Sequence, residues 1–481
     1  MPFRLCDLLA GSAGEDVPAL SVAGVQADSR AIVSGEAFFA VPGTRVHGLA
    51  FAAQALSRGA VAIITDRFPE TDPGVPVIVV QDVRAAYARA AALSHPPQPS
   101  VAVAVTGTNG KSSVVSFVRQ IWSACSIPAA SLGTVGVETD TGIAAGELTT
   151  PDALTLHKAL QKLASGGIDH VALEASSQGL DQRRVDGIAF RAVGFTNLSR
   201  DHLDYHADME TYAEAKLRLF RHLIAPGGAA VVNVDDAWSA PFVAAALDLG
   251  VTLLTVGHEG AYFEIGSIEN EGYGQRVTGR LVGEPVRFTL PLTGAFQAHN
   301  AIMALALALS SGAPRDPAIA ALATLKGARG RLERVAEHNG AAIFVDYAHK
   351  PVALETALAA LRPYATGRLV VIIGAGGDRD PGKRPMMGKA ASEGADIVIV
   401  TDDNPRMEDP VAIRAAVLAA APGAIEIGDR RAAIRHGIGL LGSGDVLLIA
   451  GKGHEDYQIV GTTKHHFSDH EVVAETLAAR Q

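Results

Sequence analysis

The stretch AVTGTNGKSS, residues 104–113, has the residue types of a loop that binds phosphate. It follows an apolar run typical of a strand and precedes a helical pattern, which is the context that a phosphate loop requires. Glycines let backbone N–H groups close on phosphate oxygens, Lys111 supplies a positive charge, and Ser112 can ligate magnesium. Val105 stands where the usual eight-residue motif has its first glycine. We predict that a nucleotide is bound by Gly107, Thr108, Asn109, Gly110, Lys111, Ser112 and Ser113.

A second candidate is the segment DDNPRMEDP, residues 402–410, which sets one arginine after a proline among acidic side chains. The apolar run ADIVIVT before it predicts a buried parallel strand, so the segment follows the carboxyl end of that strand. Open α/β sheets bind ligands at such ends. Arg406 is suited to hold a carboxylate through two parallel hydrogen bonds, and Pro405 restricts the backbone before it. Taken alone, the segment is more typical of a solvated cluster of surface salt bridges.

Length and composition limit the class of protein. A chain of 481 residues is too long for one core, and roughly two to four domains are expected. The 48% hydrophobic and 19% charged content is ordinary for a globular protein, and the formal charge of −10 argues against nucleic acid. Charged residues near the start replace the apolar stretch of a signal peptide, and no apolar run predicts membrane insertion. Two cysteines give no disulfide framework, so a cytoplasmic protein is expected.

The chain is expected to divide at two linkers. The prolines of HPPQPS, residues 95–100, cannot continue a helix or a central strand. A second boundary is expected in the basic, glycine-rich segment KGARGR, residues 326–331. Elsewhere strand-like apolar runs alternate with alanine-rich helical patterns, which predicts α/β units with parallel sheets covered on both faces. The predicted domains are residues 1–97, 98–330 and 331–481.

The loop TGTNGKSS resembles the compact phosphate loop of the ATP-dependent Mur ligases and the folylpolyglutamate synthetases. Those enzymes join a carboxylate to an amine by way of an acyl phosphate. Further strings resemble the Mur ligases in particular: TTPDALTLH, LEASSQGLDQRRV, TNLSRDHLDYH, YAEAKLRLF, DYAHKP, GGDRDPGKRP, TDDNPR and AGKGHEDYQIV. The resemblance runs from residue 28 to the last strands. It implies an N-terminal UDP-sugar-binding domain, a central P-loop ATPase-like parallel-sheet domain and a C-terminal Rossmann-like domain that binds an amino acid.

In the middle domain the resemblance implies a magnesium site beside ATP. Ser112, Glu174 and His202 match the family's magnesium ligands. Lys216 matches a lysine that carbon dioxide carbamylates, which gives an anion that organises a second magnesium. Without the resemblance, Glu174 is equally a solvated acid and Lys216 a lysine that extends from its helix to solvent. His206 lacks the further ligands of a zinc site and is expected to be structural or exposed. The implied catalytic residues are Lys111, Glu174, His202 and Lys216.

The resemblance also implies which residues bind the nucleotide and the first substrate. Nucleotide contacts are matched by Asn300, Arg331, Asp346 and His349. Alternatives are a helix cap for Asn300 and a strand-end carboxylate for Asp346. The pocket for UDP-N-acetylmuramoyl-L-alanyl-D-glutamate is matched by Ser29, Thr149, Thr150, Ser176, Gln182 and Arg184. Residues 43–48 are expected to close over the uridine end, and Leu148 and Gln178 depart from the family pattern.

The string DNPR resembles the diaminopimelate-adding branch of the family, whose lysine-adding relatives lack this arginine. meso-Diaminopimelate and lysine differ by one carboxylate at the end of the side chain, so a guanidinium there favours the first strongly. The acids around Arg406 are expected to face the ammonium groups of diaminopimelate. The amino-acid pocket is matched by Arg379, Asp403, Asn404, Pro405, Arg406, Gly451 and Glu455.

The resemblance implies an ATP- and Mg²⁺-dependent amide ligase of peptidoglycan synthesis, which we expect to be a monomer. It would add meso-diaminopimelate to UDP-N-acetylmuramoyl-L-alanyl-D-glutamate through an acyl phosphate. Three alternatives remain open: a folylpolyglutamate synthetase, a P-loop kinase that phosphorylates a hydroxyl, and a non-catalytic nucleotide-binding module. A folylpolyglutamate synthetase would not explain the presence of DNPR or of DSR at residues 28–30. A non-catalytic nucleotide-binding module would not need Glu174, His202 and Lys216 together.

Overall fold

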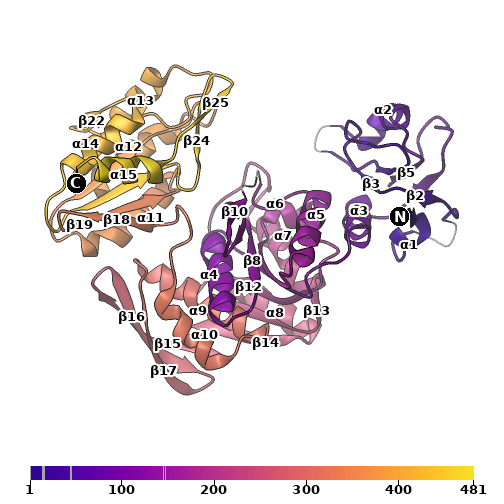
Figure 1. The fold of residues 1–481 in the computed structure, drawn as a ribbon, viewed down its shortest axis with the longest axis horizontal. Coiled ribbons are helices and arrows are strands. Elements are labelled where there is room, and N and C mark those ends of the chain that lie inside the picture. The colour runs from indigo at the N-terminus through magenta and orange to yellow at the C-terminus, as the bar shows by residue number, and fades with distance from the viewer. Residues whose placement is uncertain (1, 14–16, 44–45, 145, 147, 481) are drawn as a thin grey trace. The chain divides into compact units, whose positions relative to one another are not determined.

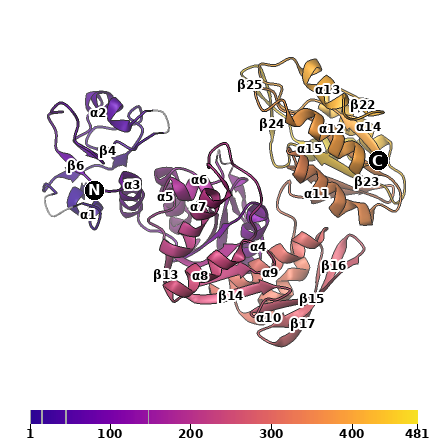
Figure 2. The same ribbon diagram turned by 180° about the vertical axis from the view of Figure 1, so that it is seen from behind.

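A computed structural model describes residues 2–13, 17–43, 46–144, 146 and 148–480 (Figures 1 and 2). The chain forms two compact units, and each is described by itself. Unit 1 comprises Met1–Ile265, Arg280–Pro285 and Asn300–Ala321; unit 2 comprises Gly266–Gly279, Val286–His299 and Leu322–Gln481. The three-domain boundaries at residues 97 and 330 stay a prediction.

Unit 1 begins with a small parallel sheet of strand order β3-β4-β5-β6. Its strands are Val25–Gln26, Ala37–Phe39, Ala62–Thr65 and Val77–Val79. Helix α3 (Val83–Leu93) begins where the Asp82 side chain accepts from Ala85 N–H, and its buried alanines and Tyr87 pack into the core of this sheet. The predicted linker at residues 95–100 follows α3 and forms neither helix nor strand, as expected.

The larger sheet that contains β7 (Val101–Thr106) lies mostly, but not wholly, within unit 1. Its order is β10-β9-β8-β11-β7-β12-β13-β14-β15-β16-β17, where β9 is Gly136–Thr139 and β10 is Gly142–Ala144. The strands β8 (Ala129–Gly133), β11 (His170–Glu174), β7, β12 (Phe190–Phe195), β13 (Ile224–Asn233) and β14 (Thr252–Gly257) pair in parallel, which confirms the predicted α/β arrangement. The long strands β15 (Phe263–Glu271), β16 (Gly274–Leu281) and β17 (Glu284–Leu290) were not predicted from the sequence.

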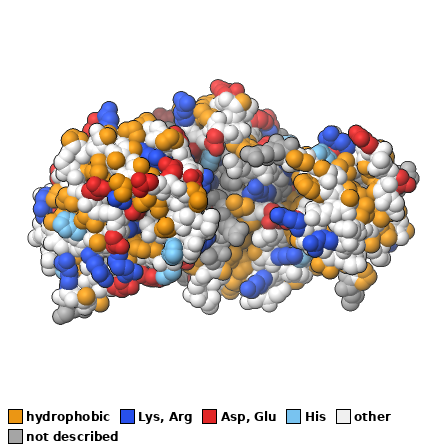
Figure 3. Space-filling view, turned by 90° about the horizontal axis from the view of Figure 1, so that it is seen from above, with side chains coloured by type: hydrophobic (Ala, Val, Ile, Leu, Met, Phe, Trp, Pro, Cys, Tyr) orange, Lys and Arg blue, Asp and Glu red, His pale blue; other side chains and the backbone are white. Residues whose placement is uncertain are grey.

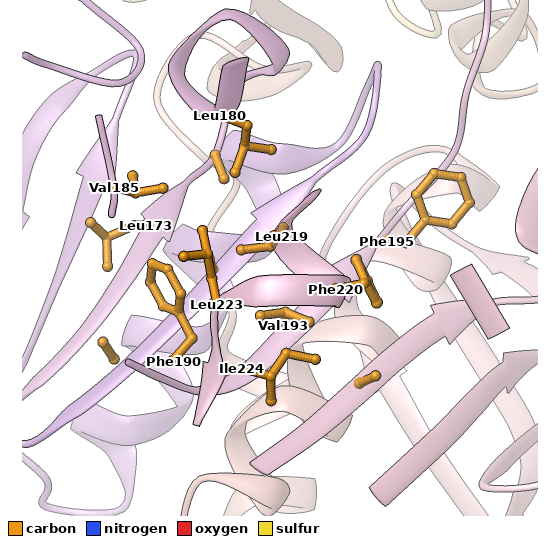
Figure 4. Packing of buried hydrophobic residues seen from close by; sticks show 14 of the residues in the cluster. Leu173, Leu180, Val185, Phe190, Val193, Phe195, Leu219, Phe220, Leu223 and Ile224 are labelled. Atoms are coloured by element: carbon orange, nitrogen blue, oxygen red, sulfur yellow. The ribbon is translucent and has the colours of Figure 1, made fainter. Parts of the chain in front are cut away.

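Helix α7 (Met209–His222) is held against this sheet by one apolar face. Figure 4 shows Leu219 and Phe220 of α7 in the same cluster as Phe190, Val193 and Phe195 of β12. Burying each such side chain stabilises the fold by about 1.5–3 kcal/mol. A capping box at Asp208 fixes the start of the helix. Because Lys216 precedes Leu219 by three residues, it lies on this inward face.

Unit 2 contains a sheet of order β18-β19-β23-β20-β21-β22. Its strands are Glu333–His338, Ala341–Asp346, Val446–Ala450, Leu369–Ile373, Ile397–Val400 and Ile425–Glu426. All neighbours pair in parallel except β18, which is antiparallel to β19. The strand β21 ends just before the segment at residues 402–410, as the apolar run predicted.

Helices cover both faces of the sheet in unit 2. Helices α11 (Pro351–Leu361), α12 (Lys383–Gly394) and α13 (Pro410–Leu418) contribute to one apolar cluster. Helices α14 (Arg430–Gly439) and α15 (Asp469–Ala478) contribute to the other. Alternate residues of the central strands supply the two clusters, since successive side chains of a strand point to opposite faces. This doubly wound arrangement confirms the predicted Rossmann-like fold of the C-terminal part.

The surface carries charges of both signs. On the face shown in Figure 3, Lys and Arg side chains are interspersed with Asp and Glu, and single hydrophobic side chains lie among them. No helix in the described part of the chain combines the length and the apolar character needed to cross a membrane.

Candidate active site

The loop between β7 and α4 (Lys111–Ala124) has a backbone shape that requires glycine at two positions. Gly107 has a φ of +149° and Gly110 of +86°. A Cβ atom on Gly107 would lie 1.9 Å from Thr196 Oγ1, and one on Gly110 would lie 2.4 Å from Asn300 Oδ1. Lys111 Nζ donates to the carbonyls of Gly107 and Thr108, both at 2.8 Å. The loop therefore folds around its own lysine, as a phosphate loop does.

Asn300 lies inside α9 (Ala295–Ser310) and not at its start, which rules out the helix-cap alternative. Its side chain is 7% exposed and faces Gly110, so this nucleotide-binding candidate meets the predicted loop. Asn197, which the sequence did not single out, also shapes the loop, because its carbonyl and its Oδ1 accept from Thr108 N–H and Asn109 N–H.

We expect Gly107→Ala to weaken nucleotide binding at least about tenfold, or ~1.4 kcal/mol, because the added methyl group forces the loop away from Thr196. Gly142→Ala is the matched control: its φ is +143°, but a Cβ there meets no atom within 4 Å. Calorimetric titration with ADP would measure both variants. Equal affinities for the two would mean that the loop does not bind the nucleotide.

Glu174 ends strand β11 and is held by the neighbouring strand end. Its Oε1 accepts from Thr134 N–H at 2.8 Å and its Oε2 from Thr134 Oγ1 at 3.3 Å, and its side chain is buried. Thr134 Oγ1 also lies 3.0 Å from Thr149 Oγ1, while Thr150 Oγ1 donates to Glu174 O at 2.9 Å and lies 3.0 Å from Ser176 Oγ. The structure thus joins Glu174 to three of the predicted substrate residues. Thr134 was missed, since only the pairing of β8 with β11 brings it here.

Two further residues predicted to bind the substrate extend this hydrogen-bond network. Arg184 Nη1 donates to Thr150 O at 2.6 Å and its Nη2 donates to Gln182 Oε1 at 2.8 Å. Gln182 Nε2 lies 3.2 Å from the hydroxyl of Tyr205. Gln182 and Arg184 line a cavity of about 420 Å³ together with Arg84. Two arginines at this cavity suit an anionic ligand.

Ser29 lines a second cavity in unit 1, of about 720 Å³, and donates to Gln54 Oε1 at 2.6 Å. Tyr87 and Asp152 line both cavities, so the two lie next to each other. Tyr87 was missed, because a tyrosine in an alanine-rich helix reads as core. In the predicted closing segment 43–48, residues 44 and 45 lie outside the described chain, and Gly43 lines the smaller cavity. Of the two departures, Leu148 is 50% exposed and Gln178 is partly buried.

Lys216 is 1% exposed and does not extend to solvent. Its Nζ donates to Gly107 O at 2.9 Å, the same carbonyl that accepts from Lys111, and lies 4.4 Å from the centre of the Tyr212 ring. Burial, reinforced by the charge of Lys111, holds the pKa of Lys216 well below that of an ordinary lysine. The structure therefore brings together two of the predicted catalytic lysines at one carbonyl of the phosphate loop.

His202 sits in the loop before α7 with a φ of +54°. Its Nε2 is 3.6 Å from Asp201 Oδ2, and its ring centre is 6.2 Å from that of Tyr212, the ring that also lies against Lys216. His206 is buried, with its ring 5.3 Å from Tyr212, so it is structural, one of the two predicted roles. Glu174 pairs in register with Val105 of β7. It therefore lies at the carboxyl-terminal end of the strands, where the loop also lies.

In unit 2, three predicted nucleotide contacts surround Tyr347. The Arg331 guanidinium lies 4.9 Å above its ring, and the His349 ring is 4.5 Å away. Asp346 Oδ2 accepts from Leu332 N–H at 2.6 Å, and burial raises the pKa of this carboxyl. Burial lowers the pKa of His349 to about 4, so this imidazole is neutral near pH 7. Tyr347 was missed, although it lies within the quoted string DYAHKP.

The backbone of Arg406 is held by hydrogen bonds through both its N–H and its carbonyl group. Its φ is +52°, its N–H donates to Ile459 O, and its carbonyl accepts from Gly461 N–H. These partners belong to the hairpin of β24 (Tyr457–Val460) and β25 (Thr463–His466). The Nη1 of Arg406 donates to Gly377 O at 2.8 Å. A Cβ on Gly376 would lie 2.9 Å from that Nη1 and 3.7 Å from Cγ of the exposed Arg379, so the two predicted arginines flank one glycine.

The acids around Arg406 mostly have partners of their own, which corrects the expectation that they face substrate ammonium groups. Asp402 pairs with Arg414, and both carboxylate oxygens of Glu408 accept from Arg384 at 2.8 Å. Asp409 caps α13 by accepting from Val411 N–H. Sequence spacing could not reveal these partners, because Arg384 and Arg414 lie on two separate helices, α12 and α13.

Asp403 differs from these acids because it lies within the predicted pocket. A Cβ on Gly451 would be 3.1 Å from Asp403 Oδ2. Its neighbour Asn404 donates from Nδ2 to Glu455 Oε2 at 3.1 Å. Strand ends β21 and β23 thus bring together four of the predicted amino-acid contacts.

Fold and site define a nucleotide-binding protein with a phosphate-loop sheet and a separate doubly wound unit. Three family models match the chain: the Mur ligase family catalytic domain at residues 21–95, the Mur ligase middle domain at 105–308, and the Mur ligase glutamate ligase domain at 330–453. The chain belongs to the Mur ligase family. The family resemblance and the Mur ligase architecture predicted from the sequence are confirmed.

Relatives match over nearly the whole chain. The UDP-N-acetylmuramoyl-L-alanyl-D-glutamate–2,6-diaminopimelate ligase of Chelativorans sp. (strain BNC1) is 52% identical, covering 96% of this chain and 95% of its own. The ligase of the same name from Caulobacter vibrioides is 50% identical, with 95% of each chain covered. A solved structure of a ligase with that name is 33% identical, with a TM-score of 0.75 over 100% of this chain and 99% of its own.

A more distant neighbour shares the fold. The folylpolyglutamate synthase of Mycobacterium tuberculosis, complexed with ADP, is 20% identical with a TM-score of 0.63, covering 83% of this chain and 94% of its own. The folylpolyglutamate synthetase alternative therefore has much weaker support than the Mur ligase one.

Proposed function

We propose that this chain is an ATP-dependent ligase that joins meso-diaminopimelate to UDP-N-acetylmuramoyl-L-alanyl-D-glutamate through an acyl phosphate, in peptidoglycan synthesis. The observation that supports this most is the presence, in one Mur ligase chain, of a phosphate loop around Lys111 and a separate pocket with Arg406. The first activates a carboxylate and the second selects an amine. Cys6 and Cys125 are free thiols, which fits a cytoplasmic enzyme. A monomer stays a prediction.

Activation of a carboxylate brings two anions together, so positive charge must gather where they meet. Lys111 lies within the phosphate loop and supplies one such charge. Arg184 and Gln182 line the smaller cavity of unit 1, where they orient an anionic substrate. Ser29, in the larger cavity, is placed to hold the nucleotide-sugar end of that substrate. These residues position the reacting carboxylate rather than exchange protons with it.

The side chains near the carboxyl-terminal ends of β7 and β11 are suited to bind magnesium. The hydroxyl of Ser112 and the carboxylate of Glu174 are oxygen donors of the kind that Mg²⁺ prefers, and His202 is the third residue proposed to hold it. When bound, the ion neutralises charge that develops on the transferred phosphoryl group. Thr134 fixes the Glu174 carboxylate through both oxygens, so the ligand is oriented before the ion arrives.

Carbamylation of Lys216 is supported by its surroundings. Two lysine nitrogens that donate to one carbonyl repel each other if both are charged, and Lys216 is the buried one. Conversion of its amine to a carbamate replaces this repulsion by attraction to Lys111 and adds an oxygen donor beside the loop. The apolar face of α7 fixes the helix that carries Lys216.

We expect ATP hydrolysis to ADP and phosphate to require both the nucleotide dipeptide and diaminopimelate. The acyl phosphate forms only on the bound carboxylate, and turnover then waits for an amine. Phosphate release would be measured with each substrate omitted in turn and with lysine in place of diaminopimelate. A stable phosphorylated product that forms without any amine would favour the kinase alternative instead.

A further inference from the structure

Lys452 is a buried charged residue in the amino-acid pocket that the proposed mechanism leaves unused. Its side chain is 0% exposed. Its Nζ lies 3.1 Å from Asn404 Oδ1 and 3.4 Å from both Asp403 Oδ1 and Glu455 Oε2. A lysine is almost never fully buried unless its charge has partners, and here all three partners are residues predicted to contact the amino acid.

The ammonium group of Lys452 fixes the orientation of the Asn404 amide. Asn404 Oδ1 accepts from Lys452 and from Ile459 N–H at 2.9 Å, so its Nδ2 must turn to Glu455 Oε2. Glu455 then accepts from Lys452 and Asn404 through the same oxygen. That arrangement leaves Oε1 as the oxygen of Glu455 that can face a ligand.

Among the three charged groups in direct contact, the two carboxylates outnumber the one ammonium group. Asp403 and Glu455 are carboxylates, and Lys452 offsets one of them. The adjacent pair Arg430–Asp469 is fully buried and neutral as a pair. Arg430 also donates from Nη2 to Ala450 O at 3.0 Å, which fixes the strand end that leads into Lys452.

We propose that Lys452 is a positioning residue that sets both the geometry and the charge of the amino-acid pocket, so that Asp403 and Glu455 together accept one ammonium group. This inference rests on the proposed function. Without Lys452, two carboxylates in a buried site repel each other, and the Asn404 amide loses its anchor. The pocket then no longer matches an amino acid that presents one ammonium group to it, while nucleotide binding in unit 1 is unaffected.

Lys452→Met tests this directly, since methionine keeps much of the side-chain length without the charge. We expect KM for diaminopimelate to rise about 30-fold or more, as when a buried charge loses its partner, with KM for ATP changed by less than about twofold. Lys389→Met is the matched control, because Lys389 is exposed on α12 and pairs only across one helical turn with Glu393. KM values for both substrates unchanged, or raised equally, in Lys452→Met would overturn the proposal.

Charge rescue separates this role from simple space filling. Combining Lys452→Met with Asp403→Asn restores the excess of one negative charge, which Asp403→Asn alone lacks, so the double variant should use diaminopimelate at least as well as Asp403→Asn. A double variant that uses diaminopimelate less well than Asp403→Asn would overturn the proposal, and this comparison does not need the Lys452→Met single variant to fold. A wild-type enzyme that ignores diaminopimelate would overturn the proposed function as well, whereas normal use by both wild type and Lys452→Met would overturn this inference alone.

Discussion

Lys216→Ala is expected to lower kcat by at least about 100-fold, or roughly 3 kcal/mol. The substitution removes a group that lies beside Lys111 at the carbonyl of Gly107, where the carbamate would organise the cations of the reaction. Nucleotide affinity should change far less, because the loop glycines and Lys111 remain. Steady-state phosphate release and ADP titration would separate these two effects.

Chemical rescue identifies which group is missing. Acetate or propionate should partly restore Lys216→Ala, because a short carboxylate can enter the space left by the side chain and replace the carbamate anion. Methylammonium should not. Arg221→Ala is the control, since Arg221 lies at the exposed end of the same helix and pairs with Glu214. Rescue by methylammonium, or full activity of Lys216→Ala, would mean that the unmodified lysine acts in the site or that it only fills space.

Much of the site could be predicted because its signals are local. The strand β7, the glycines at 107 and 110 and the helix that begins at Lys111 are consecutive in sequence, and each requires a particular residue type. The same holds for the strand β21 and the segment after it. The family resemblance then added Glu174, His202 and Lys216 to the predicted site. These residues lie far from the loop in sequence, so no local sequence pattern would have linked them to it.

The features that were missed depend on contacts between distant segments. Thr134 reaches Glu174 only because β8 and β11 are neighbours, and Tyr347 matters because Arg331 and His349 lie against its ring. The acids near Arg406 were assigned to the substrate, although Asp402 and Glu408 pair with arginines on nearby helices. Side-chain pairing of this kind has no period and no fixed spacing in sequence, so a pattern cannot reveal it.

The position of Arg406 suits recognition of a carboxylate. Its backbone N–H and carbonyl are both hydrogen-bonded to the β24–β25 hairpin. The backbone position from which the guanidinium side chain extends is therefore fixed. The contact from Nη1 to Gly377 O fixes the plane of the group. Little conformational freedom is left to lose when a ligand binds, and a preorganised fork forms stronger paired hydrogen bonds than a mobile one.

We therefore expect Arg406→Ala to lower kcat/KM for diaminopimelate by a factor between about 30 and several thousand, corresponding to roughly 2–5 kcal/mol for one lost partner of a charge pair. Alanine keeps the Cβ atom at the same φ of +52°, so backbone strain is unchanged and the loss reports on the guanidinium. Arg406→Lys should recover only part of the activity, because an ammonium group lacks the planar fork. Lysine should gain relative to diaminopimelate in the alanine variant, since an unpaired cation no longer faces its side-chain ammonium. The measurement is the ratio of kcat/KM for the two amino acids, with Arg362→Ala as the control for loss of an exposed ion pair in the same unit. An unchanged ratio would show that Arg406 does not read the distal carboxylate, and would move that role to Arg379 on the other side of Gly376.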